Sequence, residues 1–180
     1  MFVQSLEGTY ISAQIMALFI SRWELLGKPL FMIPKDFKER ILTQGQDSEM
    51  KLNYLKWLTQ GIEIDMFEIL SVFIIYTRAS LEERLHLLFR LYCYEGETTM
   101  QMDEFRFMMD KLSVSISSTL SVKKAMFLEI VRSAESNFRL NNEKLTRDEF
   151  ATYMQTAFNE LGLKLSQVTS HIKMMGFCAM

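Results

Sequence analysis

The fold is decided by the stretch Leu81–Leu112, which reads LEERLHLLFRLYCYEGETTMQMDEFRFMMDKL. Its apolar residues recur at helical spacing on both sides of the polar run 95–99, which predicts two helices joined by a loop. Ser80 and Glu83 form a capping box, so the first helix should begin directly after Ser80. The expected buried faces consist of Leu85, Leu88, Phe89 and Tyr92 before the loop and of Phe105, Met108, Met109 and Leu112 after it.

The twelve residues from Cys93 to Glu104, which lie between the two predicted helices, resemble the loop of an EF-hand. Such a loop supplies side-chain oxygens at positions 1, 3, 5, 9 and 12, a backbone carbonyl at position 7 and a glycine at position 6. In this frame Met100 stands at the eighth position. The EF-hand family places an apolar residue there, which joins a short two-strand ladder to a partner loop.

The metal ligands of this loop depart from the EF-hand pattern. The first position is Cys93, a soft thiol where a hard cation prefers a carboxylate, and the sixth is Thr98, which adopts a left-handed turn less readily than glycine. We therefore expect a unit of EF-hand shape with no bound metal and no other cofactor. The residual candidates for a weak calcium site are Glu95, Glu97, Gln101 and Glu104.

Three further units repeat the same order of an apolar helix face, an apolar loop residue and a terminal acid followed by an apolar residue. The loop residues that match Met100 are Met32, Ile64 and Leu145, and the terminal acids are Asp36, Glu68 and Glu149. The corresponding intervals 24–36, 59–68 and 135–149 hold 13, 10 and 15 residues, so the twelve-residue spacing is kept in the third unit alone. Because the strand in each loop leaves an open edge, we expect these units to associate in pairs.

The residues of these three loops also argue against metal binding. The first loop has Leu25, Gly27, Pro29 and Leu30 where oxygens are needed. The second is too short to wrap a cation, and Asp65 should instead lie near the first turn of the next helix, where the helix dipole favours it. In the fourth loop Thr146 and Glu149 predict another capping box. Its oxygens would come from Asn141, Asn142, Glu143 and Glu149, but Phe138 and Leu140 interrupt them.

The segment 65–92, DMFEILSVFIIYTRASLEERLHLLFRLY, resembles the junction between the second and third hands of calcineurin B-like and neuronal-calcium-sensor-like proteins, and of axonemal calcium sensors. The resemblance implies an all-α protein with two lobes of paired EF-hand-like helix-loop-helix units. The expected N-terminal pair spans 1–76 and the C-terminal pair spans 80–162. A short extra helix is expected in the extension 163–180.

The composition excludes several classes of function. The net charge of −2 without charged blocks argues against nucleic-acid binding, and the apolar run 69–76 is too short to cross a bilayer. Phosphate-loop and Cys-x-x-Cys motifs do not occur, and His86 lies in an apolar helix where a packed or rim histidine is expected. We therefore expect a non-enzymatic, cytoplasmic protein without a secretion leader or lipid anchor. The resemblance adds the cytoskeleton or the ciliary axoneme as its location.

The 14 methionines and 14 phenylalanines suggest how such a protein binds a partner, since EF-hand lobes hold target helices in Met-rich grooves, although single methionines also fill cores. We predict a calcium-independent scaffold subunit that binds an amphipathic helix of a larger protein within a hetero-complex. The alternative is a calcium sensor or calcineurin B-like regulatory subunit with one weak site in the third loop. The predicted groove residues are Phe73, Phe89, Met100, Phe105, Met108, Met109, Met126, Phe127, Phe150 and Met154.

Overall fold

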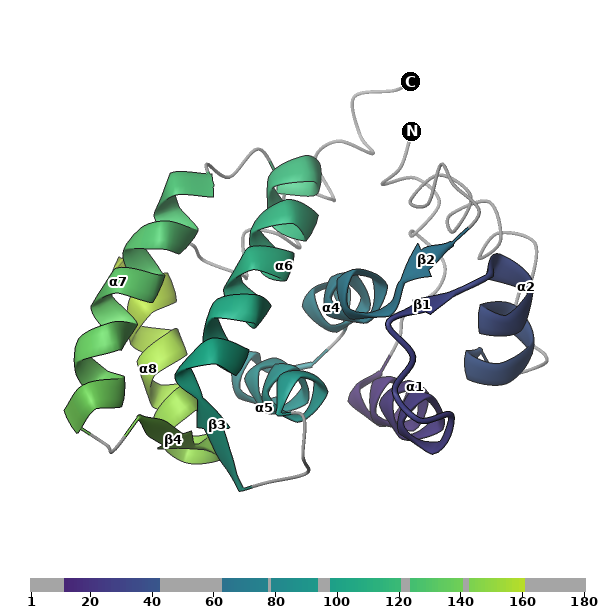
Figure 1. Ribbon diagram of the computed structural model, residues 1–180, viewed down its shortest axis with the longest axis horizontal. Coiled ribbons are helices and arrows are strands. Elements are labelled where there is room, and N and C mark those ends of the chain that lie inside the picture. The colour runs from purple at the N-terminus through teal and green to yellow at the C-terminus, as the bar shows by residue number, and fades with distance from the viewer. Residues whose placement is uncertain are drawn as a thin grey trace.

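The computed structural model describes residues 12–42, 63–77, 79–93, 98–120, 124–140 and 143–160. These residues are mostly helical with short strands, as the sequence predicts (Figure 1). The helices are α1 (Ala13–Leu25), α2 (Pro34–Asp36), the π-helical turn η2 (Phe37–Ile41), α4 (Met66–Tyr76), α5 (Leu81–Tyr92), α6 (Met102–Leu120), α7 (Lys124–Leu140) and α8 (Arg147–Glu160). The strands are β1 (Phe31–Met32), β2 (Ile64–Asp65), β3 (Thr99–Gln101) and β4 (Lys144–Thr146). The expected entering helix of the second unit, Glu95, Glu97 and the extension 163–180 lie outside the described residues.

Each pair of units is joined by the predicted antiparallel ladder. Strand β1 pairs with β2 so that Met32 lies opposite Ile64, and β3 pairs with β4 so that Met100 lies opposite Leu145. All four side chains are buried. The apolar loop residues thus face one another across two short antiparallel ladders (Figure 1).

The predicted helix starts are also present. The Ser80 side chain accepts a hydrogen bond from the Glu83 N–H, and the Glu83 carboxylate accepts one from the Ser80 N–H at 2.8 Å. Thr146 and Glu149 make the same reciprocal pair at the start of α8. Asp65 caps α4, where its Oδ1 accepts from the Glu68 N–H at 3.0 Å. These starts were predictable because each bond joins residues three positions apart.

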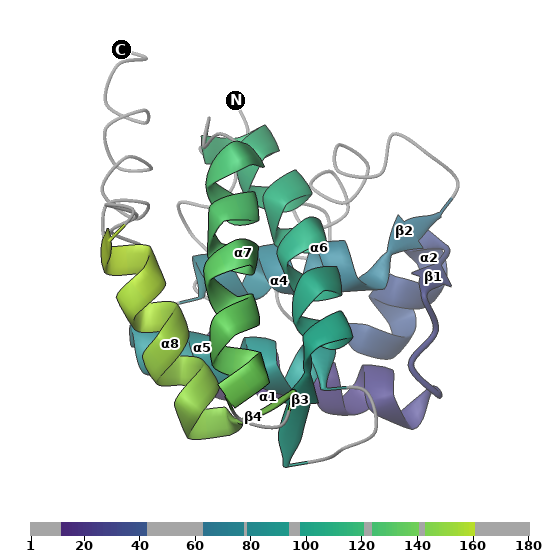
Figure 2. The same ribbon diagram turned by 60° about the vertical axis from the view of Figure 1, so that its left-hand side comes forward.

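The two predicted lobes share one continuous core. Helix α4 explains this, because all its described side chains except Glu68 are buried and a helix that is apolar all round must be covered on every side. Figure 2 shows α6 and α7 of the second pair passing in front of α4. Phe67 of α4 contacts Tyr92 at 5.2 Å and Phe107 at 5.0 Å between ring centroids. The Tyr92 hydroxyl is hydrogen-bonded to Ser71 Oγ at 2.7 Å.

An ion pair reinforces this junction between the helix pairs. Lys111 Nζ of α6 lies 2.5 Å from Asp65 Oδ2 at the end of β2, with both side chains largely shielded from water. The same ammonium group lies 5.6 Å from the centroid of the Phe107 ring. Within the described parts of the chain, no helix is both long and apolar enough to cross a membrane.

Candidate functional site

The predicted partner-binding groove is closed in this structure. Nine of its ten residues are at most 7% exposed, and the side chain of the tenth, Met126, is outside the described set. Phe105 shows the reason, because its ring contacts Phe138, Phe150 and Tyr153 from α7 and α8. The buried members are Phe73, Phe89, Met100, Phe105, Met108, Met109, Phe127, Phe150 and Met154. Apart from Phe89, which also lines the cleft described below, these residues form core and not an open groove.

Of the residual calcium candidates, Glu104 uses its carboxylate to cap a helix. Glu104 Oε2 accepts a hydrogen bond from the Gln101 N–H at 2.7 Å, just before α6. Cys93, at the first loop position, is buried and its Sγ donates to the Thr99 carbonyl at 3.4 Å. Among the described residues, no group of three or more His, Cys, Asp or Glu side chains is placed to hold a metal.

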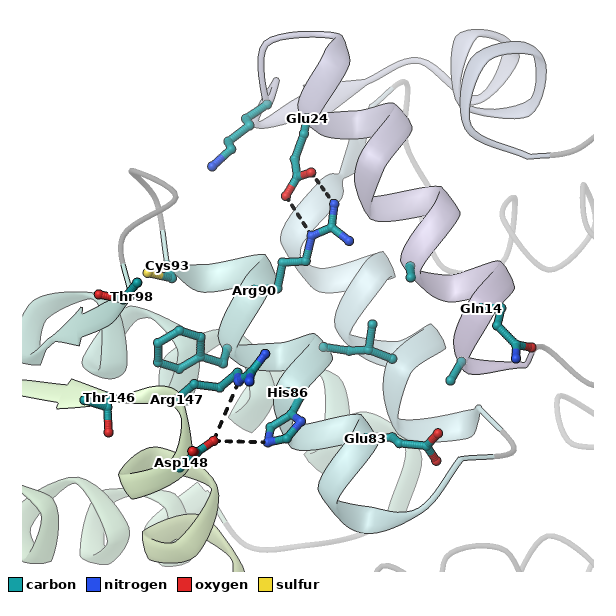
Figure 3. A pocket seen from close by; sticks show the side chains of 15 residues that line it. Gln14, Glu24, Glu83, His86, Arg90, Cys93, Thr98, Thr146, Arg147 and Asp148 are labelled. Atoms are coloured by element: carbon teal, nitrogen blue, oxygen red, sulfur yellow. Dashed lines mark hydrogen bonds and ion pairs between the residues drawn. The ribbon is translucent and has the colours of Figure 1, made fainter.

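A different site lies on the outside of α5. A cleft of about 870 Å³ lies along this helix, with α1 as one wall and the β4–α8 junction as the other (Figure 3). Its apolar lining comes from Ala13 and Ala17 of α1 and from Leu87 and Phe89 of α5. This volume is within the range typical of ligand-binding clefts, about 300 to 1,000 Å³. We call it the α5 cleft.

The local sequence explains why α5 can line both a core and a cleft. Residues 85, 88 and 92 face the core, whereas Glu83, His86, Leu87 and Arg90 recur at helical spacing along the cleft. On α1 the two alanines lie one turn apart, and their small side chains leave space between the helices.

One wall of the cleft is fixed by a two-pronged ion pair. Arg90 of α5 donates from Nε to Glu24 Oε1 at 3.2 Å and from Nη2 to Glu24 Oε2 at 2.5 Å. The same Nη2 also donates to Ser21 Oγ at 2.8 Å. A bidentate arginine–carboxylate pair restricts orientation as well as distance, so it holds α1 in position against α5 (Figure 3).

The opposite wall carries a chain of weaker contacts. His86 Nε2 lies 4.0 Å from Asp148 Oδ1, and Arg147 Nε lies 3.7 Å from the same oxygen. Figure 3 shows the His86 ring pointing from α5 toward Asp148 of α8. With 29% of its side chain exposed, His86 is the rim histidine that the sequence predicts.

The two ends of the cleft differ in charge. Glu83 lies at the start of α5, and hydrogen bonds from the Ser80 amide and hydroxyl lower the pKa of its carboxyl group, which therefore stays ionised at neutral pH. Lys28 lines the other end, beyond the C-terminus of α1. Glu24 pairs with Arg90, and Asp148 lies beside His86 and Arg147, so the apolar lining of the cleft is flanked by charged side chains.

The sequence prediction includes Phe89 of this cleft but misses its other lining residues, because it follows only the apolar face of α5. The available signal was the second face, 83–86–87–90, together with the small residues Ala13 and Ala17. Comparison with known proteins adds no assignment, since no protein-family model matches the chain and no curated protein matches it significantly.

Proposed function

We propose that this chain is a calcium-independent, EF-hand-like interaction subunit that binds an amphipathic helix of a larger partner in the α5 cleft. The ladder register and the capped helix starts support the EF-hand-like architecture. The observation that carries the function is the cleft itself, with its apolar lining and its rim of charged residues. The resemblance to axonemal calcium sensors favours a cytoskeletal partner in a hetero-complex.

A helix fits this site better than an extended chain. The lining residues of α5 run from Glu83 to Cys93, a length of about 15 Å at 1.5 Å per residue. One wall of the cleft is helix α1 and the other is the start of α8. A further helix can therefore pack along α5 as helices pack in bundles. The two ladders provide no wall of comparable length, because their strands hold two or three residues each.

The acids at the loop ends support independence from calcium. Glu104 and Glu149 would donate oxygens at the twelfth position of a calcium loop, yet both carboxylates accept hydrogen bonds from backbone N–H groups. Binding a cation there would remove a cap from α6 or α8, which opposes metal binding.

A calcium sensor or calcineurin B-like regulatory subunit is the second candidate, and one observation favours it. The third loop keeps the EF-hand spacing, with α5 ending at Tyr92 and β3 occupying loop positions seven to nine. Calorimetric titration separates the two candidates. A saturable calcium site tighter than about 10⁻⁵ M would support the sensor, and its absence would support the calcium-independent subunit.

Peptide binding tests the cleft directly. The probe, which we call the cleft peptide, is an alanine-rich helix of about 12 residues with leucines at helical spacing, matched to the cleft length. We expect binding in EDTA that calcium does not change and that Ala17→Arg weakens by roughly tenfold or more, measured by fluorescence anisotropy. Leu18→Arg is the matched control, since Leu18 is the next residue of α1 and is 41% exposed outside the cleft. Equal loss in both variants, or no binding, would contradict the proposal.

A further inference from the structure

Large apolar side chains lie exposed on the segment that connects α1 to α2. Leu25 is 86% exposed, and Phe31 and Leu30 are more than half exposed. Contiguous apolar surface on a protein marks interaction sites, and five exposed apolar side chains cluster within the nine residues from Leu25, the last residue of α1, to Ile33. The cluster, which we call the first-loop patch, consists of Leu25, Leu26, Leu30, Phe31 and Ile33.

The backbone under the first-loop patch is held in place. Gly27 and Lys28 adopt left-handed conformations with φ of 81° and 53°, which turn the chain back after α1. The Trp23 indole N–H donates to the Pro29 carbonyl at 2.9 Å, and Phe31 pairs with Asp65 in the first ladder. The apolar side chains are therefore presented on a fixed backbone. This loop would lose little conformational entropy when a partner binds.

The first-loop patch begins where the α5 cleft ends. Glu24 and Lys28 both line the cleft, and Leu25 lies between them in the chain. Figure 3 shows Glu24 at the end of the cleft far from Glu83 and Gln14. A segment that leaves the cleft at this end therefore meets the patch directly.

The charges at the two ends give a helix in the cleft a preferred direction. A helix N-terminus carries a partial positive charge and its C-terminus a partial negative charge. Ionised Glu83 favours the N-terminus of a bound helix at its end of the cleft, which leaves the C-terminus at the end lined by Lys28. The residues that follow the bound helix would then pass over the first-loop patch.

We propose that the partner segment consists of an amphipathic helix followed by an apolar tail, with the helix in the α5 cleft and the tail on the first-loop patch. This inference rests on the proposed function. The tail needs large apolar side chains, because Leu25, Leu30 and Phe31 offer aliphatic and aromatic surface. Burying one such side chain fully corresponds to about tenfold or more in affinity.

Tailed versions of the cleft peptide test the inference. One version carries the tail Gly-Leu-Leu-Phe at its C-terminus, a second carries it at its N-terminus, and a third carries a C-terminal Gly-Ser-Ser-Ser tail. We expect the C-terminal apolar tail to tighten binding by about tenfold in fluorescence anisotropy and the other two tails to change it by less than about twofold. The double variant L25S/F31S should remove the gain and leave binding of the untailed peptide unchanged.

The outcomes separate this inference from the function on which it rests. If the cleft peptide binds but all tails behave alike, the tail site is wrong and the cleft function stands. A gain that persists in L25S/F31S would also overturn the tail site, since the tail would then bind elsewhere. If no peptide binds, both proposals fail. Both substituted side chains are more than half exposed, so the variant should fold, and an unchanged melting curve by circular dichroism verifies this.

Discussion

The first and second helix pairs are built on equivalent ladders, but the residues near the two ladders differ in the side chains that they expose. In the second pair, an acid in the first turn of each helix after the ladder accepts a capping hydrogen bond, Glu104 in α6 and Glu149 in α8. In the first pair, Leu25 at the end of α1 and Phe31 in β1 are exposed. A helix cap follows the ladder in both pairs, since Asp65 caps α4, but the first pair also exposes large apolar side chains beside its ladder.

The shared part of the two pairs is the buried centre of each ladder. Met32 faces Ile64 in the first and Met100 faces Leu145 in the second, and all four side chains are at most 8% exposed. These positions cannot change freely because each packs into the core. Positions that do not pack into the core have no such constraint, and the difference between the pairs lies in these, including the exposed ladder residue Phe31.

The largest expected difference is in the free energy of unfolding, between removing a ring of the core and removing a ring of the first-loop patch. Phe105→Ala removes a fully buried side chain that contacts three other rings and should lower the free energy of unfolding by about 3–5 kcal/mol. Phe31→Ala removes a ring that is 54% exposed, so the loss should be within about 1 kcal/mol. Urea unfolding followed by circular dichroism measures both. Similar losses in the two variants would mean that the first-loop patch is structural.

A smaller difference is expected between the two residues that cap the helices after the ladders. Asp65→Ala removes the α4 cap and leaves Lys111 without its carboxylate, which should lower stability by about 2–3 kcal/mol. Thr146→Ala removes only the exposed α8 cap and should lower it by about 1 kcal/mol. Lys111→Met in the Asp65→Ala background is the control, and it should recover part of the loss by removing the half-buried ammonium group that has lost its Asp65 partner. No recovery would show that the cap alone accounts for the effect.

The sequence predicts the local features of this fold and misses those that depend on distant segments. Ladder residues such as Met100 and caps such as Ser80 follow from short, regular spacings. The merging of the two pairs into one core had a signal in the apolar run 69–76, since a helix without a polar face needs cover on all sides.

The functional surface was harder to predict, for two physical reasons. Apolar residues at helical spacing look alike whether they fill a core or line a groove, so Met108 and Phe150 were placed in a groove although both are fully buried. The α5 cleft combines Ala17, His86 and Asp148 from three separate elements. No local pattern links these residues, and only their packing brings them together.

The smallest expected effect is on the pH dependence of stability. It should differ between Glu68 and Glu149, the terminal acids of the second and fourth units. Hydrogen bonds from the Thr146 amide and hydroxyl lower the pKa of Glu149, whereas burial and the charge of Asp65 raise the pKa of Glu68. The Glu149 contribution to stability is therefore present above the ordinary pKa of about 4.5 and is lost as pH falls through the lowered value. The Glu68 contribution has the opposite sign, because the folded state holds the proton more tightly and stability falls as pH rises through its raised pKa.

Glutamine substitutions convert this difference into a measurement. Urea unfolding midpoints between about pH 3 and pH 7 should show that E149Q removes part of the stability loss on acidification, because the unfolded carboxyl no longer takes up a proton in preference to the folded one. E68Q should instead be most favourable relative to the parent near neutral pH, where the parent holds a half-buried charge. The same substitution at Glu129, an exposed residue of α7, controls for the loss of one negative charge. If E68Q and E149Q changed the pH dependence of the unfolding midpoint in the same direction, the two acids would lie in similar environments. The contrast between the half-buried Glu68 and the capping Glu149 would then be wrong.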